Sequence, residues 1–342
     1  MNNMCEKMNK LKAGLIGCGS IANYAHLPNL VKIENVDLVW VADIIKERAV
    51  DASKKYNVPK YTFDYHEILE DPEIDFVVIT TPPDTHVDIA IDALKSGKHI
   101  FLEKPVAATL EDAVRLYNFA KGKDLKIGLG FCLRFHGMFK FVKKLIDNGT
   151  VGEPIMMWRN AIGAAIGVAA PSRWVFDKKR SGGMLVENAV HIFDAFRWYA
   201  GEYESVEAYV KTVTKDLNIE DTVVASLRFR NGCYGSLVQT WVATHSWEAW
   251  GIVGRKGTVT VNGYVVGDMR VSWRGEAERE IRIKEDPGVM YFKEMVSFVD
   301  SIVNNKPVFA DLVDGIRSME AAIAVQKSGE ENRPVKLPLI DL

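Results

Sequence analysis

The sequence predicts an α/β protein with two domains, in which a doubly wound parallel sheet comes first and an α+β domain with a largely antiparallel sheet follows. Three observations support this prediction. The chain has 342 residues, a length typical of about two domains. Up to about residue 131, short apolar runs alternate with longer amphipathic stretches, whereas beyond it apolar and polar residues alternate within the runs. This change of period predicts domains at residues 1–132 and 133–342.

Five apolar runs in the first part predict strands. They are rich in β-branched and aromatic residues and mostly continuous, as expected of strands that are buried on both faces. Helix-like stretches lie between them, and one of these ends at Gly97. Strand, helix and strand in this order predict right-handed βαβ units. The five runs are residues 12–17, 36–43, 75–81, 99–104 and 126–131.

The pattern of the second part predicts hairpins and helices. Asn231-Gly232 and Asn262-Gly263 are typical hairpin turns between strand-like runs. These runs are residues 206–214, 222–229, 234–242, 249–253 and 258–261. We expect helices at residues 138–147, 291–304 and 311–326.

Composition excludes several classes of protein. The net charge of −2 gives no basic excess for nucleic-acid binding, and the 48% of hydrophobic residues is typical of a globular core. No run approaches the roughly 20 apolar residues of a membrane span, and the first residues do not resemble a signal peptide. The four cysteines have neither a disulfide pattern nor zinc-ligand spacing. We therefore expect a cytoplasmic protein without a metal site.

A glycine-rich loop follows the first predicted strand and opens a helix. Its sequence, Gly17-Cys18-Gly19-Ser20-Ile21-Ala22, has the pattern G-x-G-x-x-A. Gly17 permits a tight turn, and Gly19 lets the backbone approach a diphosphate at the helix N-terminus. A glycine turn that only connects two packed elements is the alternative.

Asp43 at the end of the second predicted strand indicates which dinucleotide binds. A carboxylate there accepts hydrogen bonds from the ribose hydroxyls and repels a 2′-phosphate. We therefore expect NAD rather than NADP. Arg48, one turn further on, could weaken this preference; a solvated helix charge is the alternative.

Two motifs follow later strands, where ligands of parallel sheets bind. Thr81 and Pro82 begin a rigid segment that includes His86, and Glu103-Lys104-Pro105 ends the strand predicted at residues 99–104. Lys104 could donate to a substrate oxygen and stabilise an alkoxide; a surface lysine paired with Glu103 is the alternative. His86 could contact a cofactor or only line the loop.

A polar group on an apolar helix is the most informative feature of the second part. From Leu185 onward the pattern is helical, which would place Glu187, His191, Asp194 and Trp198 on one face. Histidine suits proton removal near neutral pH, and a carboxylate one turn away can orient it. A buried hydrogen-bonded group that only stabilises the helix is the alternative. Trp174 could stack on a sugar ring or belong to the core.

Together these motifs resemble the Gfo/Idh/MocA oxidoreductase family, as do Arg134-Phe135, residues 146–154 and the segment from Gly182 to Asp194. The resemblance implies a Rossmann domain followed by an open-faced mixed sheet, through which such proteins form dimers or tetramers. It also implies that Lys104 contacts the reacting hydroxyl and that His191 is the general base. Glu187 stands where the family usually has aspartate, and Ala189 replaces a usual glycine. Cys132 and Gly137 replace the asparagine and proline that usually flank Arg134-Phe135.

The resulting hypothesis is an NAD-dependent dehydrogenase that transfers a hydride between nicotinamide and a ring hydroxyl of a sugar, inositol or related polyol. The alternatives are a glycoside hydrolase with transient internal redox and a non-catalytic nucleotide- or sugar-sensing protein. The expected catalytic residues are Lys104, His191 and Glu187, and the expected substrate-binding residues are Lys104, Arg134, Trp174, Glu187 and His191. The expected cofactor-binding residues are Gly17, Gly19, Ser20, Ile21, Asp43, Thr81, Pro82, His86, Glu103 and Lys104.

Overall fold

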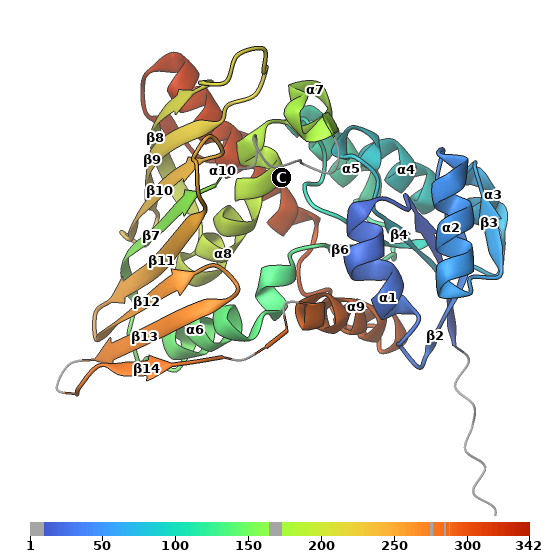
Figure 1. Ribbon diagram of the computed structural model, residues 1–342, viewed down its shortest axis with the longest axis horizontal. Helices are drawn as coiled ribbons and strands as arrows, with labels where there is room; N and C mark the ends of the chain where they lie inside the picture. The colour runs from blue at the N-terminus through green and yellow to red at the C-terminus, as the bar shows by residue number, and fades with distance from the viewer. Residues whose placement is uncertain (1–9, 164–172, 274–275, 284, 287) are drawn as a thin grey trace, which may run out of the picture.

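The computed structural model confirms the two-sheet α/β architecture (Figure 1). It describes residues 10–163, 173–273, 276–283, 285–286 and 288–342. The parallel sheet and its helices form one half of the molecule, and the larger sheet forms the opposite wall of the other half.

The first sheet has the strand order β3-β2-β1-β4-β5-β6, and all its strands are parallel. The order reverses between β1 and β4, so the carboxyl ends of these two strands border a crevice. The strands are β1 (Leu11–Ile16), β2 (Val36–Ala42), β3 (Lys60–Thr62), β4 (Phe76–Ile79), β5 (His99–Leu102) and β6 (Ile127–Leu129).

The helices of this half connect the strands as the βαβ pattern predicts. The helix after β1 begins at Ser20 and contains a π-helical turn before α1. The Thr109 side chain caps α5 by accepting a hydrogen bond from the Asp112 N–H. The elements are η1 (Ala22–His26), α1 (Leu27–Leu30), α2 (Lys46–Tyr56), α3 (His66–Glu70), α4 (Pro83–Lys95) and α5 (Leu110–Ala120).

The second sheet has, within the described ranges, nine strands in the order β14-β13-β12-β11-β7-β10-β9-β8-β15. Neighbours are antiparallel except β7 and β10, which makes the sheet mixed. The central strand β7 was not predicted, because its run has no clear alternation and carries a charge at Arg159. The strands are β7 (Pro154–Ile162), β8 (Tyr203–Lys211), β9 (Thr222–Phe229), β10 (Tyr234–Thr240), β11 (Trp247–Gly254), β12 (Gly257–Gly263), β13 (Gly267–Trp273), β14 (Arg279–Ile281) and β15 (Val335–Lys336).

Helices cover one face of this sheet and leave the other open. In Figure 1, α6, α8 and α10 lie between the sheet and the first half of the molecule. Large apolar side chains on the opposite face are exposed, among them Met156, Tyr209 and Val224. The open-faced sheet is therefore confirmed. The elements are η2 (Cys132–Phe135), α6 (Gly137–Asp147), η3 (Arg173–Phe176), α7 (Lys178–Ser181), η4 (Leu185–Ala189), α8 (Val190–Ala200), α9 (Gly288–Val303) and α10 (Leu312–Glu331).

Helix α9 comes from the second half of the chain but packs on the first sheet. The Phe298 ring lies 5.7 Å from that of Phe76 and 5.5 Å from that of Phe101, measured between centroids. Met295 and Val299 join the same buried cluster as β1 and β2. The core of the parallel sheet is thus completed by a helix that lies about 160 residues after β6 in the chain. The domain boundary at residue 132 stays a prediction.

None of the helices in the described ranges is both long enough and apolar enough to cross a bilayer.

Candidate active site

The glycine loop has the geometry that a dinucleotide diphosphate requires. Gly17 has a φ of +97°, and a Cβ there would lie 2.9 Å from the backbone of Thr80 and Thr81. A Cβ on Gly19 would meet nothing within 4 Å, so this side of the loop is open to a ligand. Ser20 and Ile21 form the first helical residues. The loop therefore fits NAD, whose diphosphate the loop and the helix N-terminus would hold.

Asp43 follows β2 and fixes this loop. Its carboxylate accepts one hydrogen bond from the Cys18 N–H and one from the Ile45 N–H, each at 2.8 Å. Each oxygen keeps a further lone pair, and the side chain is only half-buried. Asp43 can thus support the loop and still accept hydrogen bonds from ribose hydroxyls.

The π-helical turn after the glycine loop places His26 against Glu103. His26 Nε2 lies 2.6 Å from Glu103 Oε1, and the Lys104 N–H donates to Glu103 Oε2 at 3.0 Å. Burial by itself would raise the pKa of Glu103, but the hydrogen bond and charge of His26 and the charge of Lys104 lower it overall. Glu103 therefore supports the loop that carries Lys104. Sequence reasoning missed His26, since no local pattern connects residues 77 positions apart.

His86 connects two loops at the crevice. The ring is fully buried, with Nδ1 2.8 Å from the Pro105 carbonyl and Nε2 2.8 Å from the Thr81 carbonyl. Both nitrogens face protein carbonyls, so the ring supports the loops and does not face the crevice. Thr81 and Pro82, by contrast, are half-buried, and Thr81 lies beside Gly17.

Lys104 joins the two halves of the molecule. Its Nζ lies 2.7 Å from the backbone carbonyl of Glu187 and 3.2 Å from Glu187 Oε1. Burial would lower the pKa of Lys104, but the charges of Glu187 and Glu103 raise it overall, so the ammonium stays charged. The ammonium forms its ion pair with Glu187 of the second half. The alternative of a surface lysine paired with Glu103 therefore does not describe this residue.

His191 lies one turn after Glu187. Burial, followed by the positive charges of Lys104 and Arg159, holds the pKa of His191 well below its usual value, so the ring is neutral near pH 7. Nδ1 is buried without a partner among the described residues, while the ring as a whole is half-buried. Nε2 is therefore the nitrogen that can reach a ligand.

The predicted helix face is only partly correct. A π-helical turn over residues 185–189 precedes α8, so the regular 3.6-residue spacing does not continue across the segment. Asp194 is buried against Arg134, with two hydrogen bonds of 2.8 and 2.6 Å. Trp198 lies beside Lys143, whose Nζ is 5.9 Å from the ring centre. The structure thus joins Glu187 to Lys104, with His191 one turn further along the chain, and gives Asp194 and Trp198 other partners, Arg134 and Lys143.

Arg134 and Trp174, the other two residues predicted to bind substrate, lie in different environments. The Arg134 guanidinium is buried and also donates to Asp314 and to the Phe309 carbonyl, so its hydrogen bonds hold helices together. Trp174 lies half-buried in η3, and its contact with substrate stays a prediction.

A polar row on the second sheet lies beneath the helix of His191, and sequence reasoning missed it. Arg159 on β7 is 4% exposed and lies over the Tyr264 ring, 4.9 Å from its centre. Gln239 on β10 and Glu248 on β11 contact the same guanidinium. Only the register of three strands brings these residues together.

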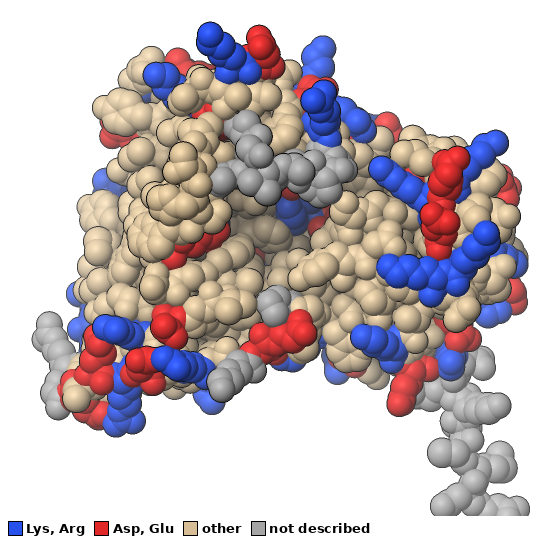
Figure 2. Space-filling model, in the orientation of Figure 1, with Lys and Arg blue, Asp and Glu red and all other residues tan. Residues whose placement is uncertain are grey.

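Figure 2 shows a hollow between the two halves of the molecule, with acidic and basic side chains at its base.

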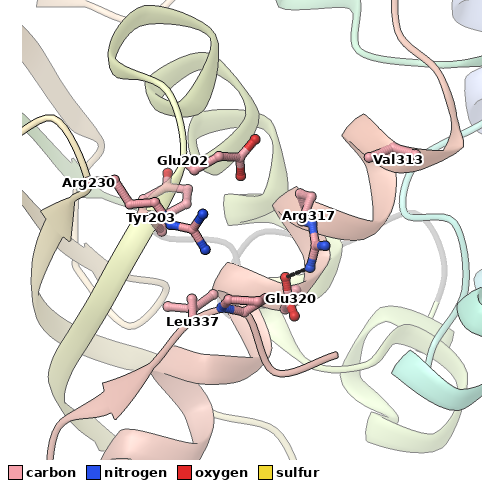
Figure 3. Close-up of a pocket in the computed structure, with 8 residues that line it drawn as sticks. Glu202, Tyr203, Arg230, Val313, Arg317, Glu320 and Leu337 are labelled. Atoms are coloured by element: carbon pink, nitrogen blue, oxygen red, sulfur yellow. Dashed lines mark hydrogen bonds and ion pairs between the residues drawn. The ribbon is translucent and has the colours of Figure 1, made fainter. Parts of the chain in front are cut away.

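A separate cavity of about 290 Å³ lies beside the first turns of α10 (Figure 3). Both of its carboxylates are paired: Glu320 accepts from Arg317 at 2.7 Å, and Glu202 accepts from Arg197 at 2.6 Å. None of the predicted site residues lines it. The lining residues are Glu202, Tyr203, Arg230, Val313, Arg317, Glu320, Leu337 and Pro338.

Comparisons with known proteins agree with this geometry. Residues 11–131 match the family model described as "Oxidoreductase family, NAD-binding Rossmann fold", and residues 139–260 match "GFO/IDH/MocA C-terminal domain". A myo-inositol 2-dehydrogenase of Thermotoga maritima is 30% identical, and the match covers 96% of this chain and 98% of the relative. A scyllo-inositol 2-dehydrogenase (NAD(+)) of Bacillus subtilis is 27% identical, with 96% of each chain covered.

Solved structures share the fold. A levoglucosan dehydrogenase in complex with NADH and levoglucosan has a TM-score of 0.91 at 24% identity, and the match covers 97% of this chain and 100% of that one. Both family models match in order, and a relative with 30% identity spans nearly the whole chain. The chain therefore belongs to the Gfo/Idh/MocA family of NAD-binding oxidoreductases.

Proposed function

We propose that the protein is an NAD-dependent dehydrogenase that oxidises a ring hydroxyl of a sugar, inositol or related polyol. One observation carries this proposal: the charged Lys104 of the first half meets Glu187 of the second half, one turn before the neutral His191. A positive charge and a neutral base beside a dinucleotide loop are the groups that alcohol oxidation needs.

The roles of the residues follow from their charges. Lys104 donates a hydrogen bond to the substrate hydroxyl and stabilises the negative charge that develops on its oxygen. His191 accepts the hydroxyl proton at Nε2. Glu187 holds the Lys104 ammonium in place through its carbonyl and its carboxylate. When bound, NAD would accept the hydride from the carbinol carbon.

Relatives support the substrate class. Two of them are named as inositol 2-dehydrogenases, and another, from Pseudarthrobacter phenanthrenivorans, as a levoglucosan dehydrogenase. All three names describe oxidation of a cyclic polyol or an anhydrosugar, and the proposal extends this class to the present chain.

The test is NADH absorbance with purified protein, NAD and a panel of myo-inositol, scyllo-inositol, levoglucosan and common aldoses. We expect NADH with one ring-polyol class. A flat trace from protein that binds NADH would contradict the proposal. Cleavage of nitrophenyl glycosides without net NADH would then indicate a glycoside hydrolase, and neither activity would indicate a sensor.

A further inference from the structure

Asn188 is a polar residue of the candidate site that the roles above leave unused. Every residue from Ser181 to Phe196 is buried except Glu187, Asn188 and His191, which are half-buried. Glu187 and His191 already have roles at the reacting hydroxyl. Asn188 lies between them in the chain, directly after the carbonyl that holds the Lys104 ammonium.

A line of hydrogen bonds fixes the orientation of the Asn188 amide. Arg159 forms an ion pair with Glu248, with Nη2 3.1 Å from Glu248 Oε2, and Nη1 donates to Gln239 Oε1 at 2.9 Å. Because a guanidinium has only donors, the atom of Gln239 that faces it must be the oxygen. Gln239 Nε2 therefore donates, and it lies 3.0 Å from Asn188 Oδ1.

This line determines what Asn188 offers to a ligand. Its oxygen is occupied by Gln239, which is 1% exposed and held by the guanidinium. Within the described ranges, the hydrogen bond from Gln239 to Oδ1 is the one that the Asn188 side chain makes, and the side chain is half-buried, so Nδ2 keeps its hydrogens for a ligand. Asn188 therefore presents an N–H₂ group that no acceptor of the described residues binds, and it directly follows Glu187, which holds Lys104.

We propose that Asn188 determines substrate specificity by donating from Nδ2 to a substrate oxygen on a carbon next to the one that is oxidised. Gln239 and Arg159 are positioning residues, because they fix which atom of the amide faces the substrate. The favoured substrates carry an acceptor oxygen at that neighbouring carbon, as vicinal diols of rings do. This inference rests on the proposed function, since it requires a polyol beside Lys104.

The experiment replaces the donor by an acceptor of the same shape. With the panel polyol that gives NADH, we expect Asn188→Asp and Asn188→Leu to raise KM about tenfold or more, as expected when a hydrogen bond to substrate is lost. The change in kcat should be smaller, and the Kd for NADH, measured by fluorescence, should stay within twofold. Asn262→Asp, an exposed asparagine on β12, is the matched control and should keep the wild-type KM.

Gln239→Glu tests the positioning role without touching the substrate. The carboxylate still accepts from Arg159 but has no hydrogen to donate, so the Asn188 amide should turn its N–H₂ toward position 239 and its oxygen toward the substrate. We expect a rise in KM similar to that of Asn188→Asp. The double variant Asn188→Leu/Gln239→Glu should have a KM within twofold of that of Asn188→Leu alone.

Deoxy analogues of the same polyol provide a second test of the hydrogen bond from Asn188. In the wild type, removal of the contacted hydroxyl should raise KM, whereas in Asn188→Leu the parent and the analogue should have similar KM values. Unchanged KM values for folded Asn188→Leu and Gln239→Glu variants would overturn the inference and leave the dehydrogenase proposal standing. Absence of NADH with the wild type contradicts the dehydrogenase proposal. Calorimetric titration of the protein–NADH complex with myo-inositol or levoglucosan then tests Asn188 by binding alone. Equal affinity of the wild type and Asn188→Leu for the polyol would overturn the inference.

Discussion

Single residues of the site depend on charges that come from both halves of the chain. His191 is neutral because it is buried and because two cations, Lys104 and Arg159, disfavour its protonation. Lys104 stays charged because two carboxylates outweigh its burial. The motif residues were predictable, since the glycine loop, Lys104 and His191 stand in recognisable local patterns. Arg159 was not, because its place depends on strand register.

Replacing His191 by alanine should lower kcat by about 100-fold, the typical contribution of a positioned general base. Steady-state kinetics by NADH absorbance measure this, while NADH binding followed by fluorescence should change little. His66→Ala, at an exposed histidine on α3, is the control. Turnover of His191→Ala within threefold of wild type would contradict its role as base.

Replacing Asp43 by serine should reduce the preference for NAD over NADP by at least about tenfold, because the carboxylate that repels a 2′-phosphate is removed. The ratio of kcat/KM for the two cofactors measures the change. Asp51→Ser, at an exposed aspartate on α2, should leave the ratio unchanged. A wild-type enzyme that prefers NADP tenfold would contradict the assignment of Asp43.

Among whole elements, two helices depart from regular α-helical spacing where the site lies. π-helical turns occur at residues 22–26 and 185–189, the first bringing His26 to Glu103 and the second preceding His191. Sequence periodicity assumes 3.6 residues per turn, so it correctly predicted that these segments are helical but not which residues share a face. The second turn changes the spacing between Glu187 and the residues of α8. Asp194 lies with His191 in α8 itself and pairs with Arg134 because a tertiary contact, which periodicity does not show, brings that arginine to it.

Helix α9 contains a carboxyl group that should make stability depend on pH. Glu294 is 2% exposed, and neither oxygen has a hydrogen-bond partner among the described residues. Burial raises the pKa of Glu294 well above its usual value. The folded protein therefore holds a proton that the unfolded chain releases, and stability falls as the pH rises from about 4.5 toward the folded pKa.

Glu294→Gln, which keeps the shape and cannot ionise, should consequently raise the melting temperature more at pH 8 than at pH 5. Differential scanning fluorimetry at the two pH values measures this. Glu331→Gln, at an exposed glutamate that ends α10, is the control and should show no such difference. An equal effect of Glu294→Gln at both pH values would show that the carboxyl is ionised throughout.

The molecule as a whole exposes an apolar sheet face, and we propose that two copies bury it against each other. Val224 on β9 is 49% exposed, beside Tyr209 and Val238, its cross-strand neighbours on β8 and β10. Val224→Glu should reduce the mass measured by light scattering to that of a monomer. Val31→Glu, at a valine of similar exposure in the first half, should not. A monomeric wild type would contradict the proposal.

The position of α9 also has a consequence for synthesis on the ribosome. The last strand of the parallel sheet ends at Leu129, but the helix that supplies Phe298 to its core ends about 170 residues later. At roughly 5–20 residues per second, the nascent sheet waits about 10–30 s with an apolar surface uncovered. Chaperones should therefore bind the emerging chain in this interval, and release of α9 from the exit tunnel should end that binding.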